Sequence, residues 1–158
     1  YAFTGTVTGA GGVNTPSFFA TTSTQHSITN QTDTKIQFAT EVVDTDNCYD
    51  PSTNYRFTPT TAGKYHIFLT CSVETQGGVS TFNYAFIKLK KNGSLIYQSY
   101  VDSSNNNTYA AQGVVNAVVD MNGSSDYVEG FINCNASSST IRTQTGEYMM
   151  FGGYKIIE

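Results

Sequence analysis

The sequence predicts an all-β sandwich with minimal helix. Turn-forming residues recur at short intervals along the chain, and the segments between them alternate apolar and polar residues with the period of two of a half-buried strand. No segment carries a convincing apolar stripe with the 3.6-residue period of a helix. Aromatic residues make up 13% of the chain, and they favour strands because they pack well on a pleated sheet.

The clearest predicted strand covers residues 64–74. Tyr65 and Leu69 share one face of this strand with other apolar residues, whereas His66 lies on the opposite face. The remaining strands are predicted over residues 17–24, 35–43, 55–58, 82–90, 95–101, 110–121, 127–135 and 148–157, with turns at Asp50-Pro51, Asn92-Gly93 and Asn122-Gly123 among others.

Two of these strands, 82–90 and 127–135, carry apolar residues on both faces. In the first, Ala85 and Leu89 lie on one face and aromatic side chains on the other. Rings that face away from the core either cause aggregation or are buried in an oligomer; the alternative is that strand twist and loops cover them within one chain. We therefore predict a symmetric assembly with an interface formed by Phe82, Tyr84, Phe86, Tyr127 and Phe131.

The length of 158 residues fits a single domain. Residues 1–15 are rich in Gly and Thr, which predicts a flexible arm or linker, and the domain is expected over residues 16–158. Charged residues make up 13% of the chain, and the small cluster of Lys88, Lys90 and Lys91 cannot supply the basic stripe that binds nucleic acid. No apolar run approaches the roughly 20 residues of a membrane-spanning helix. We expect neither nucleic-acid binding nor membrane insertion.

The residues that carry catalytic chemistry are few and scattered. Cys48, Cys71 and Cys134 lack the spacing of zinc ligands, and an odd number leaves at least one thiol unpaired. His66 and Cys71 differ in parity along one strand, so they point to opposite faces and cannot form a nucleophile pair. The acids of the C-terminal half contain no pair whose spacing marks a glycosidase. We expect no enzymatic activity.

Two polar segments are candidate binding sites. The spacing of Asp44, Asp46 and Asp50 is faintly like that of a calcium loop, but the Gly and closing Glu of that loop are missing. Only a looser calcium site is conceivable there, against the usual role of such acids as turn caps, and no other cofactor is expected. Exposed polar loops carry recognition on rigid scaffolds. The recognition residues expected on this basis are Gln76, Ser104, Asn105, Asn106 and Asn107.

Eight short motifs follow one another along the chain. They are Phe18-Phe19-Ala20, Ile36-x-Phe38 with Glu41, Cys48-Tyr49-Asp50, Tyr55-x-Phe57-x-Pro59, Ala62-Gly63-x-Tyr65, Lys91-Asn92-Gly93, Ser125-Asp126-Tyr127-Val128 and Phe151-Gly152-Gly153-Tyr154. In this order they resemble the globular head of the complement C1q family, itself similar to the tumour necrosis factor jelly roll. The resemblance covers about residues 17–157. Its most specific run is the one in which Pro59 and Gly63 end one strand and begin the next.

The resemblance implies a ten-stranded jelly-roll sandwich that forms a tight homotrimer, with recognition loops at its apex and flanks. It would also bring the strands of Cys71 and Cys134 face to face, where the thiols either pair or, as is more common, stay free. Two departures matter. Ser125 stands where the family usually has Gly, and no Gly-X-Y repeat precedes the domain, which argues against a collagen-stalked protein.

These observations predict a non-enzymatic trimeric head of a phage or virus structural protein, either a capsid decoration or a tail-fibre tip. The low charge, the Gly/Thr arm and the Ser/Thr/Asn-rich surface favour a virion surface. Expected partners are the chain itself, other virion proteins and a host-surface glycan or receptor. The alternative is a secreted, extracellular C1q-like recognition or signalling domain that binds a receptor or carbohydrate. An enzyme is the third class.

Overall fold

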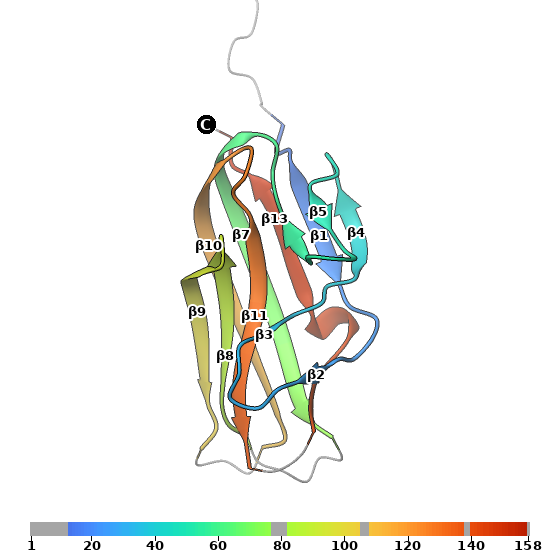
Figure 1. Cartoon of the computed structure of the whole chain (residues 1–158), viewed down its shortest axis with the longest axis vertical. Coiled ribbons are helices and arrows are strands. Elements are labelled where there is room, and N and C mark those ends of the chain that lie inside the picture. Colours follow the sequence, from blue (N-terminus) through green and yellow to red (C-terminus); the bar gives the residue numbers. More distant parts are fainter. Residues whose placement is uncertain (1–12, 77–81, 105–107, 138–139, 158) are drawn as a thin grey trace, which may run out of the picture.

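The computed structural model describes residues 13–76, 82–104, 108–137 and 140–157. Over these residues the chain forms two antiparallel sheets that pack face to face (Figure 1), which confirms the predicted all-β class. Sheet A contains β1 (Ser17–Thr21), β2 (Ser27–Ile28), β4 (Thr40–Asp44), β7 (Ala62–Thr75), β10 (Ala110–Asn122), β12 (Ile141–Thr143) and β13 (Met150–Lys155). Sheet B contains β3 (Thr34–Lys35), β5 (Tyr49–Asp50), β6 (Arg56–Phe57), β8 (Phe82–Lys91), β9 (Ser94–Asp102) and β11 (Val128–Ala136). A 3-10 helix, η1 (Gly146–Tyr148), precedes β13.

The core lies between the inner faces of the two sheets. In sheet A, β7 pairs with β10 on one side and with β12 and β13 on the other. Its Tyr65, Ile67, Leu69 and Cys71 are fully buried, so the inward face predicted for residues 64–74 is confirmed. In sheet B, β11 pairs with β8 on one side and with β3 and β6 on the other, and it buries Val128, Ile132 and Cys134.

Phe82 departs from the alternation predicted for β8. Its side chain is 0% exposed and belongs to the core, whereas Tyr84 and Phe86 lie on the outer face. The pairing with β11 shifts here, because Tyr84 lies opposite Asn135 whereas Phe82 lies opposite the next residue, Ala136. Such a β-bulge adds one residue to a strand and reverses the side-chain parity beyond it. The prediction that Phe82 faces outward is therefore wrong.

The described residues form thirteen strand segments rather than ten. The predicted strand 35–43 is divided, because the chain leaves sheet B after Lys35 and enters sheet A at Thr40. Ile36 and Phe38 in this crossing segment are fully buried although they belong to no strand. The two-residue strands β2, β3, β5 and β6 carry too little sequence to show a period.

The two ends of the sandwich hold different parts of the chain. The described N-terminal residues and the C-terminus lie at one end, and the chain segments that enter and leave residues 77–81, 105–107 and 138–139 lie at the other (Figure 1). Along one side, β9 is the edge of sheet B and β10 the edge of sheet A, and these two strands contact each other. Residues 1–12 of the predicted arm lie outside the described part of the chain.

Candidate functional site

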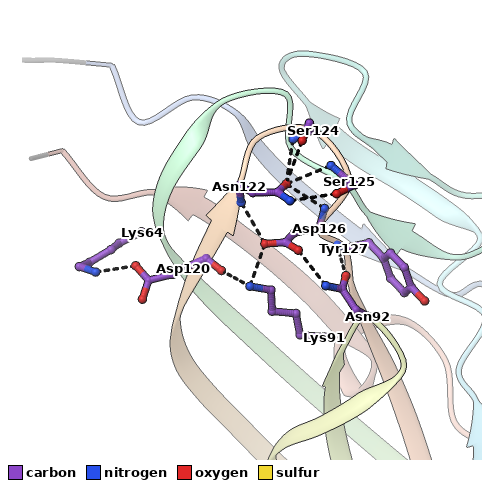
Figure 2. A network of polar contacts seen from close by, with 9 residues as sticks. All are labelled: Lys64, Lys91, Asn92, Asp120, Asn122, Ser124, Ser125, Asp126 and Tyr127. Atoms are coloured by element: carbon purple, nitrogen blue, oxygen red, sulfur yellow. Dashed lines mark hydrogen bonds and ion pairs between the residues drawn. The ribbon is translucent and has the colours of Figure 1, made fainter.

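Asn122 closes the turn between β10 and β11 (Figure 2). Its side-chain oxygen accepts the backbone N–H groups of Ser124, Ser125 and Asp126, each at 3.0 Å. Gly123 takes a φ of +71° in this turn, and a Cβ there would lie 2.2 Å from the backbone nitrogen of Ala62. The Asn122-Gly123 pair is thus fixed by the geometry of a tight turn packed against the start of β7.

Asp126 joins this turn to the turn between β8 and β9. Its carboxylate accepts from Lys91 Nζ and from the Asn92 side-chain amide, each at 2.8 Å, and from the Asn122 backbone N–H at 3.0 Å (Figure 2). These hydrogen bonds, with that from Lys91 the largest, hold the pKa of Asp126 below its usual value. These groups bind one another within the chain and join two turns, which indicates a structural role.

The outer face of sheet B carries a cluster of rings. Phe86 stacks on Tyr100 with ring centroids 4.7 Å apart, and Tyr84 lies 5.3 Å from Phe86. Tyr84 and Phe86 are half-buried, whereas Tyr100 is 54% exposed. The structure thus places two of the five predicted interface residues together on an outer surface and adds Tyr100, which the sequence interpretation did not include.

The other two predicted interface residues, Tyr127 and Phe131, are covered by cations of the same chain. The Arg56 guanidinium lies 4.3 Å from the Tyr127 ring centroid, and Lys90 Nζ lies 4.1 Å from that of Phe131. Asp33 neutralises this region by pairing with Lys88 at 2.6 Å and Lys90 at 2.8 Å. Partial burial raises the pKa of Asp33, but the hydrogen bonds from both lysines outweigh it and hold the pKa well below its usual value.

A second apolar surface, which we call the belt, lies on the outer face of sheet A. Two ion pairs bound it, Lys64–Asp120 at 2.5 Å and Arg142–Glu74 at 2.8 Å. Between these pairs, the outward positions of β7, β10 and β13 hold no Asp, Glu, Lys or Arg. Val114 and Val118 are 50% and 53% exposed. The belt consists of Phe19, His66, Phe68, Val114, Val118 and Tyr154.

Close aromatic contacts organise the belt. His66 lies 5.3 Å from Tyr154 and 6.1 Å from Phe68 by ring centroids, and Phe19 lies 6.2 Å from Phe68. The Phe68 ring covers Gly152, where a Cβ would lie 2.3 Å from it. Within the described residues, Nδ1 of His66 is buried without a hydrogen-bond partner. The sequence interpretation missed this surface because apolar residues here alternate with Thr, Ser, Asn and Gln, which is typical of a solvated face.

The acids considered for calcium have other partners in the structure. Asp44 accepts the backbone N–H groups of Cys48 and Tyr49 at 3.0 and 2.8 Å. Asp50 accepts those of three residues, Ser52 to Asn54, and these hydrogen bonds lower its pKa. Asp46 accepts from the Thr45 hydroxyl. Within the described residues, no three His, Cys, Asp or Glu side chains form a group that could hold a metal ion.

Two of the predicted recognition residues follow the ends of long strands, Gln76 directly after β7 and Ser104 shortly after β9. Gln76 and Ser104 are exposed, whereas Asn105, Asn106 and Asn107 lie outside the described residues. The Gln76 backbone N–H donates to Thr140, so the segments after β7 and before β12 meet here. In the described part of the chain, no helix has the length and apolarity needed to cross a bilayer.

The three cysteines are buried free thiols. Cys71 of sheet A and Cys134 of sheet B both point into the core between the sheets. Burial raises the pKa of Cys134 to about 12, and burial together with the nearby Cys134 raises the pKa of Cys71 even further. Neither thiol is therefore an activated nucleophile at neutral pH.

A pocket of about 280 Å³ lies beside η1. It is lined by residues 144–148 and by Gln25 and Glu74. The pairing of β12 with β7 brings Glu74 next to the segment that follows β12. The sequence interpretation missed this site because its residues come from three distant segments that share no motif.

Comparisons with known proteins bear on the fold. No protein-family model matches the sequence, and no curated protein matches it significantly. The structure is similar to that of the globular domain of the zebrafish complement 1qA protein, with a TM-score of 0.60 and 14% identity over 90% of this chain and 98% of that one. It is also similar to the Eiger TNF of S. frugiperda, with a TM-score of 0.61 and 11% identity over 90% of this chain and 91% of that one. The chain therefore has the C1q/TNF-like jelly-roll fold.

Proposed function

We propose that this domain is a non-enzymatic head that assembles as a homotrimer and recognises a surface or receptor. The belt is the observation that carries this proposal. A charge-free apolar surface with two half-exposed valines and a buried, unpaired imidazole nitrogen is unusual for a face left in water. A second copy of the chain would bury it without separating any ion pair, because both bounding pairs lie at its ends.

A cyclic trimer joins two different patches of each subunit, because its contacts run from one subunit to the next around the ring. The belt is our candidate for the first patch. The second is the cluster of Tyr84, Phe86 and Tyr100 on sheet B, which retains part of the interface predicted from the sequence. Tyr127 and Phe131 are weaker candidates because their rings already contact Arg56, Lys35 and Lys90.

The absence of enzymatic activity is part of this proposal. Three acids of the C-terminal half are paired with basic side chains: Glu129 pairs with Lys35, Asp120 with Lys64, and Asp126 with Lys91. His66 lies on the outer face of β7 and Cys71 on its inner face, so they form no nucleophile pair.

We place the head on a virion surface, as a capsid decoration or tail-fibre tip that contacts other virion proteins and a host glycan or receptor. The low charge and the Ser/Thr/Asn-rich surface support this setting. The second candidate is a secreted, extracellular recognition or signalling head, supported by the likeness to a complement 1qA domain and to a TNF. A fibre shaft or capsid-anchoring segment encoded beside the domain would favour the first, and a signal peptide with a collagen or coiled-coil stalk the second.

The assembly is tested by multi-angle light scattering at several dilutions. We expect a mass three times the 17.2 kDa of the chain, independent of concentration. Val118→Glu places a charge on the belt and should shift the mass toward that of one chain, while circular dichroism still shows a folded β-protein. Tyr100→Glu tests the second patch in the same way. A wild-type monomer at micromolar concentration would overturn the proposal, and a trimer that survives Val118→Glu would overturn the role of the belt.

A further inference from the structure

The pocket beside η1 is built around a carboxylate whose hydrogen bonds orient two amides. Glu74 Oε1 accepts from Arg142 Nε at 2.9 Å and from Gln25 Nε2 at 3.1 Å, and Glu74 Oε2 accepts from Gln144 Nε2 at 3.1 Å. These hydrogen bonds, with that from Gln144 the largest, hold the pKa of Glu74 below its usual value. The carboxylate therefore stays ionised and holds the pocket wall in one arrangement.

This arrangement makes the pocket rich in hydrogen-bond acceptors. Each amide uses its nitrogen on Glu74, and no described residue donates to the amide oxygens of Gln25 and Gln144, which can therefore accept hydrogen bonds from a ligand. Glu147 lines the same pocket, and no described residue donates to its exposed carboxylate. A ligand that satisfies these groups must bring several donors, as the hydroxyl groups of a sugar do.

Tyr148 adds an apolar surface to this polar wall. Tyr148 is 45% exposed and lines the pocket next to Glu147. The backbone beneath both residues is fixed, because the Gly146 N–H donates to Thr22 at 2.9 Å and the Met149 N–H donates to Gly146 at 3.0 Å. A pyranose has one face lined by C–H groups and a rim of hydroxyl groups, so it can contact an aromatic ring and several acceptors together.

We infer that this pocket binds a single neutral pyranose unit, a conclusion that names the ligand class and the site for the recognition role proposed above. The volume of about 280 Å³ is slightly below the roughly 300–1,000 Å³ of pockets for drug-sized ligands, so it suits one small ring. Glu147 disfavours sugars that carry a carboxylate, because Arg142 is already paired with Glu74 and cannot offset the repulsion. Sialic and uronic acids should therefore be rejected.

Saturation-transfer difference NMR on the intact wild-type protein tests this inference with methyl glycosides of glucose, galactose and mannose, N-acetylglucosamine, glucuronic acid, sialic acid and glucosamine. At least one neutral sugar should bind with the millimolar affinity normal for one small ring, and the two acids should not. Tyr148→Ala should weaken that binding at least tenfold. Tyr97→Ala removes a similarly exposed ring from β9, outside the pocket, and should leave the affinity unchanged.

Each of the other outcomes overturns the assignment. Equal binding by wild type and Tyr148→Ala would place the sugar elsewhere, and binding of glucosamine alone would show that the pocket selects positive charge. If no sugar in the panel binds while light scattering still gives a trimer, the pocket inference fails and the proposed head function stands. Circular dichroism and the melting temperature of Tyr148→Ala show whether a loss of binding reflects unfolding.

Discussion

The side-chain amide of Asn92 donates a hydrogen bond to the carboxylate of Asp126 at 2.8 Å, although the two residues lie 34 positions apart in the sequence. The oxygen of the same Asn92 amide accepts a hydrogen bond from the backbone N–H of Tyr127 at 2.9 Å. Two of the motifs that carried the family resemblance, Lys91-Asn92-Gly93 and Ser125-Asp126-Tyr127-Val128, are therefore one contact in space (Figure 2). The first motif supplies the donors, Lys91 and Asn92, and the second supplies the Asp126 carboxylate that accepts from them.

The turn next to this contact should depend on Asn122. Asn122→Ala removes the oxygen that accepts three backbone N–H groups, and we expect the free energy of unfolding to fall by about 1–2 kcal/mol. Urea denaturation followed by circular dichroism measures it. Ser125→Ala is the control, because it removes only the hydroxyl that the Asn122 amide reaches and should change stability by less than about 0.5 kcal/mol. Equal losses in both variants would contradict the role of the oxygen.

The bulge in β8 predicts unequal losses of stability when two of its rings are removed. Phe82→Ala opens a cavity in the core and should cost about 3–5 kcal/mol of unfolding free energy. Phe86→Ala removes a half-buried ring from the outer face and should cost the folded subunit about 1 kcal/mol or less. Chemical denaturation at a low protein concentration, where assembly contributes least, compares the two. A larger loss for Phe86→Ala would show that Phe82 is not a core residue.

The buried cysteines should resist alkylation in the native protein. Cys71 and Cys134 are inaccessible, and burial raises both pKa values, so almost no thiolate forms at pH 8. Under non-reducing conditions we expect iodoacetamide to leave both residues unmodified in the native state and to modify three cysteines after unfolding in guanidinium. Mass spectrometry of intact protein and of peptides reads the result. A single modified cysteine after unfolding would reveal a disulfide.

Acidification should weaken the fold through His26. Burial lowers the pKa of His26, more than its hydrogen bond with Thr24 raises it, and its Nε2 accepts the Gln37 N–H at 3.3 Å. The folded state thus favours the neutral ring, so this stability is complete above the unfolded pKa of 6.5 and declines as the pH falls toward the folded value. The melting temperature should drop between pH 7 and pH 5 and drop less in His26→Gln. If the melting temperatures of the wild type and of His26→Gln fall equally over this pH range, His26 is not the group responsible.

Calcium should have no effect on thermal stability. The carboxylates of Asp44 and Asp50 already accept backbone N–H groups in their own turns, so a cation would compete with those hydrogen bonds. We expect equal melting temperatures in millimolar calcium and in excess chelator. A rise with calcium that Asp46→Asn abolishes would demonstrate a site in this loop.

The sequence allowed the long strands to be predicted more closely than the outer surfaces. The prediction for residues 110–121 nearly matches β10, because every inward position from Ala111 to Met121 holds an apolar residue or Gly. Phe82 could not be placed, because Phe82, Tyr84 and Phe86 show a regular period of two, and only the pairing with β11 reveals the shift. The pocket depends on even longer separations: Glu74 binds Gln25 across 49 residues and Gln144 across 70. Local patterns cannot predict contacts created by strand order.

The side of the sandwich where β9 and β10 meet bears on the solubility of the protein. From Ser94 to Val101, β9 contains no charged residue and no Pro, and it exposes Leu95, Tyr97 and Tyr100. Natural proteins usually protect an edge strand with charge, Pro or cover, because its free N–H and C=O groups can template another strand. A chain outside the proposed trimer would therefore be prone, at high concentration, to pair its strands with other chains and aggregate. A closed ring of chains that covers this edge would protect the protein against precipitation.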